Sequence, residues 1–472
     1  MDTKALRQKI LDLAIHGKLV PQDPNDEPAS VLLERIRTEK ERLIKEGKIK
    51  KGKKSAKTSD KPHYPYKLPK GWKWCKLGDI AYVGTGATPL TTCKYYYENG
   101  NIAWINSSST KVPFIAKASN FITRKAIEET NCLVYPKGTL VIAMYGEGKT
   151  RGQISELLID AATNQACAAV CPYFEATKEY LKLFFEGNYL HIRALAEGGN
   201  QPNLSLGKIQ NYEIPLPPLD EQKRILEQAK KLLLQVENIE KEKEKNKNSI
   251  KQAKAKILNL AIHGKLVPHD LNDEPASELL RRINPKAEII SDNGHYQNLP
   301  KGWCLTTLES ITNYGSCVNV SVQEIPKDAW VLELEDIEKD SAKILCARHK
   351  KDREIKGVRH RFKAGDILYS KLRTYLNKVL IAPNEGFCTT EIIPISVKLG
   401  IHNKYICHVL RSQAFLDYTA QCGYGVKMPR LSTKDAQNGI IPLPPYNEQL
   451  RIVSMVEKLL ADLGTIEESL AR

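Results

Sequence analysis

The sequence predicts an α+β protein in which two globular segments, in a pseudo-two-fold arrangement, are joined by long antiparallel coiled-coil helices. Three observations lead to this prediction. One stretch occurs twice, as Lys9–Pro21 and as Lys256–Pro268, and its two copies differ only at Asp12 and Asn259. Two long segments share their opening and closing motifs. A heptad pattern of apolar residues fills much of the region between these segments.

Composition narrows the class of partner. A chain of 472 residues is long enough for two or more domains, each with its own core. Its net charge of +16 favours a polyanion, either nucleic acid or an anionic membrane surface. No apolar run approaches the roughly 20 residues of a spanning helix, and the N-terminus lacks the apolar core of a signal peptide. The eleven cysteines include no CxxC pair, which indicates a reduced, cytoplasmic protein.

The first copy of the repeat predicts a helix over residues 4–16. Gly17 ends this helix by adopting the left-handed conformation, and Pro21 prevents it from restarting. His16 and its counterpart His263 could serve as metal ligands or bases. Because no Cys, Asp or second His stands at ligand spacing, we interpret both as packing residues at helix ends. A second amphipathic helix is predicted from Ser30 to Glu46.

A change of composition follows this second helix. The stretch from 48 to 67 carries lysine at 48, 50, 51, 53, 54, 57, 61 and 67 with almost no apolar residue. Such a segment cannot pack and is predicted to be a mobile basic linker. Two interpretations stay open: a solvated tether, or a tether that also makes loose phosphate contacts.

The two globular segments open and close in the same way. Leu68–Trp72 and Leu299–Trp303 both read LPKGW, and residues 214–218 and 441–445 both read IPLPP. An offset of 227 that aligns the closing motifs also aligns Gly138 with Gly365, Thr163 with Thr390 and Leu204 with Leu431. The segments therefore resemble two copies of one fold with different interiors. Strands are predicted at 139–145 and 366–370, and helices at 178–196 and 404–422.

The longest predicted element is a helix from Leu219 to Ile262. Apolar residues step along it by four and three, with Lys243 and Asn246 as polar members of the seam. Such a helix would be about 65 Å long. The C-terminal tail from Ile452 to Leu470 has the same spacing and supplies a partner for the seam.

The repeat is cut as a circular permutation would cut it. The C-terminal tail stops where the N-terminus begins, so residues 1–36 and 441–472 are expected to form a second copy of region 214–283. The predicted organisation has five parts. These are the N-terminal half of the scaffold repeat with the basic linker (1–61), the first globular domain (62–213), the central helical spacer (214–284), the second globular domain (285–440), and a C-terminal helix that completes the second repeat (441–472).

One motif suggests nucleotide chemistry. Ala143–Thr150 fits the relaxed phosphate-loop pattern, in which backbone amides and Lys149 would hold phosphates ahead of a helix. A P-loop nucleotide hydrolase is therefore one alternative. However, residues 151–154 predict no clear helix, and the aligned loop at 370–377 lacks the pattern. A catalytic constellation is not found: the only Pro-Pro pairs lie in the two IPLPP motifs, where no base-holding tetrapeptide of an adenine methyltransferase occurs.

The same loops suit DNA contact better. Basic, amide and aromatic side chains at strand ends are the chemistry of phosphate and base-edge recognition. The candidate DNA-binding residues of the first copy are Thr88, Lys94, Tyr96, Tyr145, Lys149, Arg151, Gln153, Asn200, Gln201 and Asn203. Those of the second copy are Lys371, Arg373, Tyr375, Lys378, Tyr424, Lys427 and Arg430. Ordinary surface turns and core aromatics remain the alternative for individual members, as does a coiled-coil scaffold protein for the whole chain.

The chain resembles the specificity (S) subunit of type I restriction-modification systems. This resemblance is carried by the LPKGW openings, the IPLPPxxEQxRI exits, the heptad helices and the repeated AIHGKLVP stretch. The resemblance covers essentially the whole chain. It implies that each globular copy is a target-recognition domain for one half of a bipartite, asymmetric site in double-stranded DNA. It also implies that the helices act as a ruler between the half-sites and dock two methyltransferase (M) subunits, which methylate adenine.

The resemblance further implies that restriction (R) subunits join the same assembly. S-adenosylmethionine, ATP and Mg²⁺ would then be held by the partner subunits, and this chain would hold no cofactor, no metal and no catalytic residue. The Lys-rich insert at 48–67 departs from the family pattern, which leaves the role of the insert open.

Overall fold

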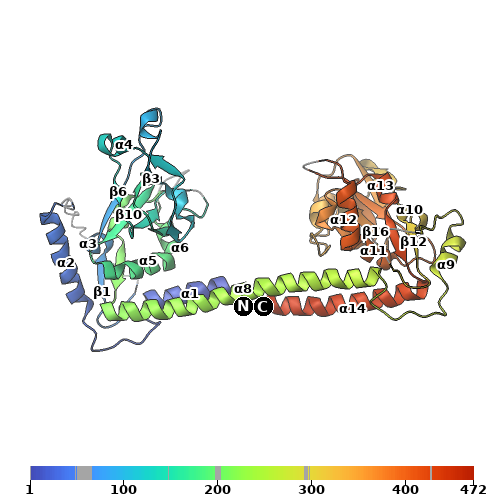
Figure 1. Ribbon diagram of the computed structural model, residues 1–472, viewed down its shortest axis with the longest axis horizontal. Helices are drawn as coiled ribbons and strands as arrows, with labels where there is room; N and C mark the ends of the chain where they lie inside the picture. Colours follow the sequence, from blue (N-terminus) through green and yellow to red (C-terminus); the bar gives the residue numbers. More distant parts are fainter. Residues whose placement is uncertain are drawn as a thin grey trace. The chain divides into compact units, whose positions relative to one another are not determined.

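The computed structural model describes residues 2–47, 49, 66–146, 148–196, 203–291, 296, 298–425 and 428–471. The basic linker predicted at 48–67 lies almost wholly outside these residues. The chain divides into two compact units, which we call the first unit (residues 2–242) and the second unit (residues 243–472). Each unit combines helices with β-sheets (Figure 1), so the predicted α+β class is confirmed.

The first unit contains seven α-helices among its described residues and the beginning of an eighth. The helices are α1 (Thr3–Ile15), α2 (Ala29–Lys45), α3 (Leu77–Ile80), α4 (Arg124–Glu129), α5 (Lys178–Gly187), α6 (Tyr189–Ala194), α7 (Leu206–Gln210) and α8 (Leu219–Ile262). The strands are β1 (Lys73–Lys76), β2 (Ala81–Thr85), β3 (Ile102–Ile105), β4 (Phe114–Ile115), β5 (Asn120–Ile122), β6 (Val134–Tyr135), β7 (Leu140–Ala143), β8 (Ile154–Leu157), β9 (Ala161–Thr163), β10 (Cys167–Pro172) and β11 (Glu213–Leu216).

The second unit begins within α8. Its further helices are α9 (Ala276–Ile283), α10 (Leu308–Ile311), α11 (Asn403–Arg411), α12 (Gln413–Cys422), α13 (Thr433–Gln437) and α14 (Tyr446–Ala471). Its strands are β12 (Cys304–Thr307), β13 (Val318–Ser321), β14 (Val331–Leu332), β15 (Val358–Phe362), β16 (Ile367–Ser370), β17 (Val379–Ile381), β18 (Gly386–Thr389), β19 (Ile392–Ile395) and β20 (Ile440–Leu443).

The sheets of the first unit place a buried strand at their centre. One sheet has the order β2-β10-β7-β8-β4, and a second has the order β5-β3-β9-β6. All four residues of β7 are buried, as expected for a strand covered on both faces. In the second unit, β16 has the corresponding place, between β17 and β19, and all four of its residues are buried as well. A further sheet has the order β13-β15-β18-β14.

A short antiparallel pair joins the two ends of each globular domain. β1 pairs with β11 in the first unit, and β12 pairs with β20 in the second. Because β1 and β12 follow the LPKGW motifs and β11 and β20 carry the IPLPP motifs, these pairs explain why both motifs recur together. The motifs are the entry and exit of each domain, held side by side.

In each unit, two antiparallel helices carry the globular domain (Figure 1). In the first unit, α1 runs along the beginning of α8, where Arg7 and Glu240 form an ion pair. In the second unit, α14 runs along the end of α8, where Lys254 donates to Glu467. The helix predicted from Leu219 to Ile262 is confirmed with these ends.

The repeated motifs make the same contacts twice. The Trp72 indole donates to the buried carboxylate of Glu221 at 3.0 Å, and the Trp303 indole donates to that of Glu448 at 3.1 Å. The hydroxyl of Tyr180 donates to the carbonyl of Pro215, as does that of Tyr405 to the carbonyl of Pro442, both at 2.6 Å. These shared contacts fix one frame in both copies.

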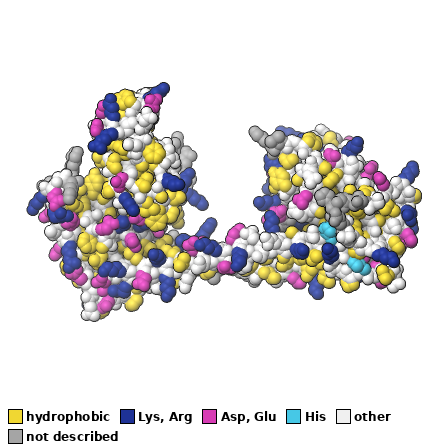
Figure 2. Space-filling view, viewed as in Figure 1, with side chains coloured by type: hydrophobic (Ala, Val, Ile, Leu, Met, Phe, Trp, Pro, Cys, Tyr) yellow, Lys and Arg dark blue, Asp and Glu magenta, His cyan; other side chains and the backbone are white. Residues whose placement is uncertain are grey.

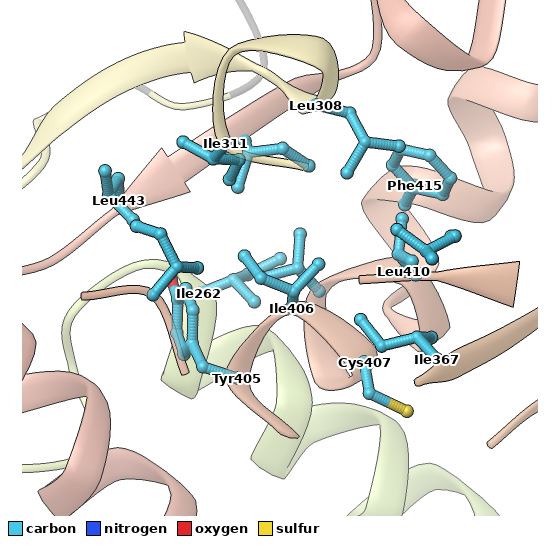
Figure 3. Close-up of a cluster of buried hydrophobic side chains, with 14 of the residues drawn as sticks. Ile262, Leu308, Ile311, Ile367, Tyr405, Ile406, Cys407, Leu410, Phe415 and Leu443 are labelled. Carbon is cyan, nitrogen blue, oxygen red and sulfur yellow. The ribbon is translucent and has the colours of Figure 1, made fainter. Parts of the chain in front are cut away.

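The core of the second unit shows how α8 enters the domain. Ile262 of α8 lies against Tyr405 and Leu443, and Ile406 and Leu410 of α11 extend the cluster toward Ile367 (Figure 3). The corresponding core of the first unit includes Leu11, Ala14 and Ile15 of α1. The two copies of the repeated stretch therefore contribute the same apolar face to their domains.

His16 and His263 lie at helix ends, in agreement with our interpretation. The ring of His16 packs on Tyr66 with 4.2 Å between centroids, and that of His263 packs on Tyr296 at 5.5 Å. Each Nδ1 also contacts a carbonyl oxygen one turn earlier in its helix, that of Asp12 or Asn259. Both histidine rings therefore pack against a tyrosine and bond a carbonyl at the end of their own helix.

Two predicted helices are each split into two. The helix predicted at 178–196 is broken at Asn188, which separates α5 from α6, and the side chain of Asn188 donates to the carbonyl of Phe184. The helix predicted at 404–422 is broken at Ser412, whose extended backbone and hydroxyl cap α12. Side-chain capping of this kind competes with helix continuation, and the apolar periodicity alone did not reveal it.

Candidate nucleic-acid interface

In the first unit, the ends of three strands meet at one edge of the sheet. Ala143, the last residue of β7, pairs with Cys167, the first residue of β10, and Thr85, the last residue of β2, pairs with Ala168. The loops that follow β2 and β7 and the turn that precedes β10 therefore emerge together. We call this edge, with the described residues of the loops at 86–97, 144–153 and 164–166 and with residues 203–204, the first strand-end surface.

The loop at 144–153 is a hairpin between β7 and β8. Its first residue is fixed on both sides, because the Met144 amide donates to the Ala166 carbonyl at 2.8 Å and the Leu204 amide donates to the Met144 carbonyl at 3.0 Å. The hydroxyl of Tyr189 in α6 donates to the Lys149 carbonyl at 2.6 Å. The loop is thus held from three directions.

Within this hairpin, the predicted side chains differ in exposure. Tyr145 and Lys149 are exposed, whereas Arg151 and Gln153 are half-buried. Asn203 is half-buried beside the hairpin, next to the residue that bonds Met144. Asn200 and Gln201 lie outside the described residues. The structure therefore brings together the 145–153 and 203 segments, which are distant in sequence.

The loop after β2 contacts the turn before β10. At Gly86, a β-carbon would stand 1.6 Å from the Thr163 carbonyl oxygen, so only glycine allows this close approach. Two residues later, the exposed Thr88 donates its hydroxyl hydrogen to Oε1 of Gln165 at 2.7 Å. Gln165 is exposed, and we did not predict it as a site residue. Its partner stands 77 positions away, so sequence spacing gave no signal for it.

The prediction that Tyr96 of this loop contacts DNA does not agree with its burial. Tyr96 is only 8% exposed, belongs to an apolar cluster with Ile122 and Ala126, and donates its hydroxyl hydrogen to Glu129 at 3.1 Å. Its ring fills the core because the short helix Lys94–Tyr96 turns it inward. Lys94 is exposed on the same short helix.

The second unit repeats the backbone arrangement of this edge. Ser370, the last residue of β16, pairs with Ile392, the first residue of β19. The Lys371 amide donates to the Glu391 carbonyl at 3.0 Å, and the Leu431 amide donates to the Lys371 carbonyl at 2.9 Å. These bonds match those of Met144 in the first unit. We call this edge, with residues 371–378, 390–391, 424–425 and 428–431, the second strand-end surface.

The side chains on this surface are of a different kind. Tyr375 and Tyr424 are 58% and 59% exposed, and Arg430 is exposed and donates to Glu391 at 2.8 Å. Arg373 and Lys371 are half-buried, and Arg373 has a left-handed backbone with φ of 51°. Lys427 lies outside the described residues.

Lys378 points inward, contrary to the prediction of a DNA contact. Its ammonium donates to the Leu334 carbonyl at 2.6 Å, and burial lowers the pKa of this group. A lysine used to tie the loop to the short helix Leu334–Asp336 is not free to reach a phosphate. On the face of each unit that Figure 2 shows, basic, acidic and hydrophobic side chains are interspersed.

Comparison with known proteins decides the family. The family model described as the type I restriction modification DNA specificity domain matches residues 69–251 and 350–471, which together make up well over half of the chain. The chain belongs to this family. The first matched region contains the first strand-end surface and reaches into α8, and the second contains the second strand-end surface and α14.

Relatives of this specificity-domain protein agree along nearly its whole length. The type I restriction enzyme EcoAI specificity subunit of Escherichia coli is 28% identical over 97% of this chain and 89% of the relative. The EcoEI specificity subunit, also of E. coli, is 26% identical over 96% and 88%. A solved chain from work on complex assembly and conformational transition of the type I R-M system superposes with a TM-score of 0.56 at 17% identity, covering 86% of this chain and 94% of that one. This last likeness shows a shared fold.

The fold of the specificity-domain protein also excludes a phosphate-binding loop at Lys149. Such a loop joins a strand to the N-terminus of a helix, where amides and the helix dipole meet the phosphates. Here the loop joins β7 to β8, and β8 begins at Ile154. The hydrolase alternative is therefore not supported.

Across the described ranges, no group of three or more His, Cys, Asp or Glu side chains is placed to hold a metal ion. Within the same part of the chain, no helix is both long and apolar enough to cross a membrane.

Proposed function

We propose that this chain is the DNA sequence-recognition subunit of a type I restriction-modification complex and that each strand-end surface reads one half of a bipartite, asymmetric site. One observation carries the proposal. The two surfaces share their backbone contacts, at Met144 and at Lys371, but carry different side chains. A repeated frame with unlike reading groups suits a target with two unlike halves.

Membership of the DNA specificity family and the names of the relatives support this proposal. The net charge of +16 supports it as well, since phosphate contacts by Lys and Arg dominate binding to DNA. The reading groups stand at strand ends and loops on a rigid sheet, where binding residues are commonly held.

The repeated scaffold gives a reason for two identical partners. The Trp72–Glu221 and Trp303–Glu448 contacts fix the helix α8 start and the helix α14 start in the same way against their domains. Equivalent surfaces recruit equivalent subunits, and we propose that two methyltransferase subunits dock here, with restriction subunits joining through them. Adenine N6 methylation, S-adenosylmethionine, ATP and Mg²⁺ then belong to those partners, and this chain acts without a catalytic residue of its own.

Footprinting of the complete complex on DNA tests the proposal. The expected result is protection of two short sequences, unlike each other, separated by a gap in which base identity does not matter. Protection of one continuous sequence, or binding without sequence preference, would contradict it.

A pair of lysine variants locates the surface of the first unit. Lys149 is exposed on the hairpin after β7, and Lys137 is exposed at the opposite end of β7. If Lys149 contacts a phosphate, Lys149→Ala should reduce the slope of log affinity against log salt by about 0.9, whereas Lys137→Ala should leave it unchanged. Titration of binding against salt concentration measures both slopes. Equal slopes for the two variants would show that the DNA interface does not lie at this edge.

A further inference from the structure

On each strand-end surface, a side chain of the turn before a strand accepts a hydrogen bond from a side chain of another segment. In the first unit, Thr88 donates to Gln165 in the turn before β10, at 2.7 Å. In the second unit, Arg430 donates to Glu391 in the turn before β19, at 2.8 Å. Both turns bond the residue that follows the central strand, Met144 through Ala166 and Lys371 through Glu391. Only the turn member of each pair, Gln165 or Glu391, therefore has a corresponding place in the two copies. Its partner comes from the loop after β2 in the first unit and from the residue before Leu431 in the second.

The first pair presents a carboxamide in a fixed orientation. The Thr88 hydroxyl uses one lone pair of the Gln165 Oε1 and leaves the second lone pair and the Nε2 amide hydrogens. A glutamine in this state matches adenine, since its oxygen accepts from the adenine N6 amine while its amide donates to N7. Gln165 is exposed, so its side chain is available to a ligand.

The second pair presents a guanidinium in a fixed orientation. Glu391 holds Nη2 of Arg430, and the backbone of Arg430 is tied to Tyr424 by reciprocal amide bonds of 2.9 and 3.1 Å. The side chain of Arg430 is 48% exposed and that of Glu391 is 22% exposed. An arginine whose backbone and one nitrogen are fixed still offers N–H groups to guanine O6 and N7, the commonest specific contact in the major groove.

We propose that these two pairs are specificity-determining readers, with Gln165 selecting an adenine in the half-site of the first unit and Arg430 selecting a guanine in the half-site of the second. Thr88 and Glu391 are positioning residues that aim the two readers. The inference rests on the proposed function and assigns to it the base that each reader recognises. It also explains how one backbone frame yields two different half-sites: the turn before β10 carries the reader itself in the first unit, whereas the turn before β19 carries the carboxylate that aims the reader in the second.

Selection of bound sequences from a random DNA library by the complete complex tests the inference. Gln165→Ala should lower discrimination at one adenine position of one half-site by about tenfold or more, and Arg430→Lys should do the same at one guanine position of the other half-site. Lysine keeps the charge but lacks the planar fork. Each variant is the matched control for the other, because its own effect should be confined to one half-site.

Two further variants separate reading from folding. Gln165→Glu should shift the preferred base at its position from adenine to cytosine, because a carboxylate accepts from cytosine N4. Thr88→Val should weaken the adenine preference, and Thr88→Ser, which restores the hydroxyl, should recover it. A misfolded variant would lose binding to all sequences and could produce neither a changed base nor a recovery.

The outcomes that overturn the inference are distinct. Unchanged preferences in Gln165→Ala or Arg430→Lys overturn it, as does a loss spread over both half-sites. If the unaltered complex selects no two-part sequence, the proposed function itself has failed. This outcome is distinguished from failure of the inference because it is seen without any variant.

Discussion

Gly17 shows how strongly a single residue of the repeat is constrained. Its φ is +63°, and a β-carbon there would stand 2.5 Å from the Cγ of Pro69 and 3.0 Å from the Trp72 ring. Its counterpart Gly264 has the same φ and a β-carbon site 2.3 Å from the Cγ of Pro300. The repeated stretch therefore requires glycine at this position for two reasons, the left-handed backbone and the close contact with a proline and a tryptophan.

A comparison of two glycines separates these causes. Gly17→Ala should destabilise the first unit by well over the 1 to 2 kcal/mol or so of left-handed strain, because Pro69 and Trp72 must also shift. Gly47 has φ of +70° but no atom near its β-carbon site, so Gly47→Ala should show the strain alone. Chemical denaturation of both variants measures the difference. Equal losses would mean that the contact with Pro69 is easily relieved.

His408 provides a pH-dependent test at the same scale. It is 8% exposed in α11, and burial lowers its pKa to about 4. Because the unfolded chain binds the proton near pH 6.5, stability from the neutral ring is complete above that pH and is lost as the pH falls toward 4. The loss should reach about 3 kcal/mol at most.

Thermal unfolding between pH 7 and pH 4.5 measures this effect. The melting temperature of the second unit should fall less steeply with pH in His408→Leu than in the unaltered chain. A slope in His408→Leu equal to that of the unaltered chain would show that the buried ring does not resist protonation.

At the scale of elements, helices α8 and α14 are equivalent where they begin. Ile225 and Ile452 are both fully buried in the cores of their units. Truncation of either to alanine should cost about 2 to 5 kcal/mol. Leu234 on α8 is 55% exposed, so Leu234→Ala should change stability by no more than about 0.5 kcal/mol. Denaturant titrations of the three variants test this ranking. A large loss of stability in Leu234→Ala would mean that Leu234 makes a packing contact that the structure of the unit does not show.

The elements also show what the sequence could and could not predict. The ends of α8 and the recurring LPKGW and IPLPP pairings follow from local periodicity and from the repeat. Burial of side chains within loops does not follow from periodicity or from the repeat. Tyr96 and Lys378 have the chemistry of DNA contacts, but tertiary partners turn both side chains inward. Gln165, which we propose as a reader, could not be found from the sequence, because its bond with Thr88 joins residues that only the fold brings near.

For the whole molecule, we propose that one repeated frame carries two readers of DNA and that the length of α8, which belongs to both units, determines the gap between their half-sites. No residue between Val236 and Ile250 of this helix is buried. Seven residues inserted between Asn238 and Ile250 should therefore lengthen the helix by about 10 Å without disturbing either core. This length corresponds to about three base pairs of DNA at 3.4 Å per step.

The most direct test is the sequence recognised by the complete complex before and after this insertion. Both half-sites should keep their bases while the gap between them grows by about three base pairs. Replacement of the exposed residues Glu244, Lys245 and Lys247 by alanine, which keeps the length of the helix, is the control and should leave the gap unchanged. An unchanged gap after the insertion, or altered bases in either half-site, would contradict the account.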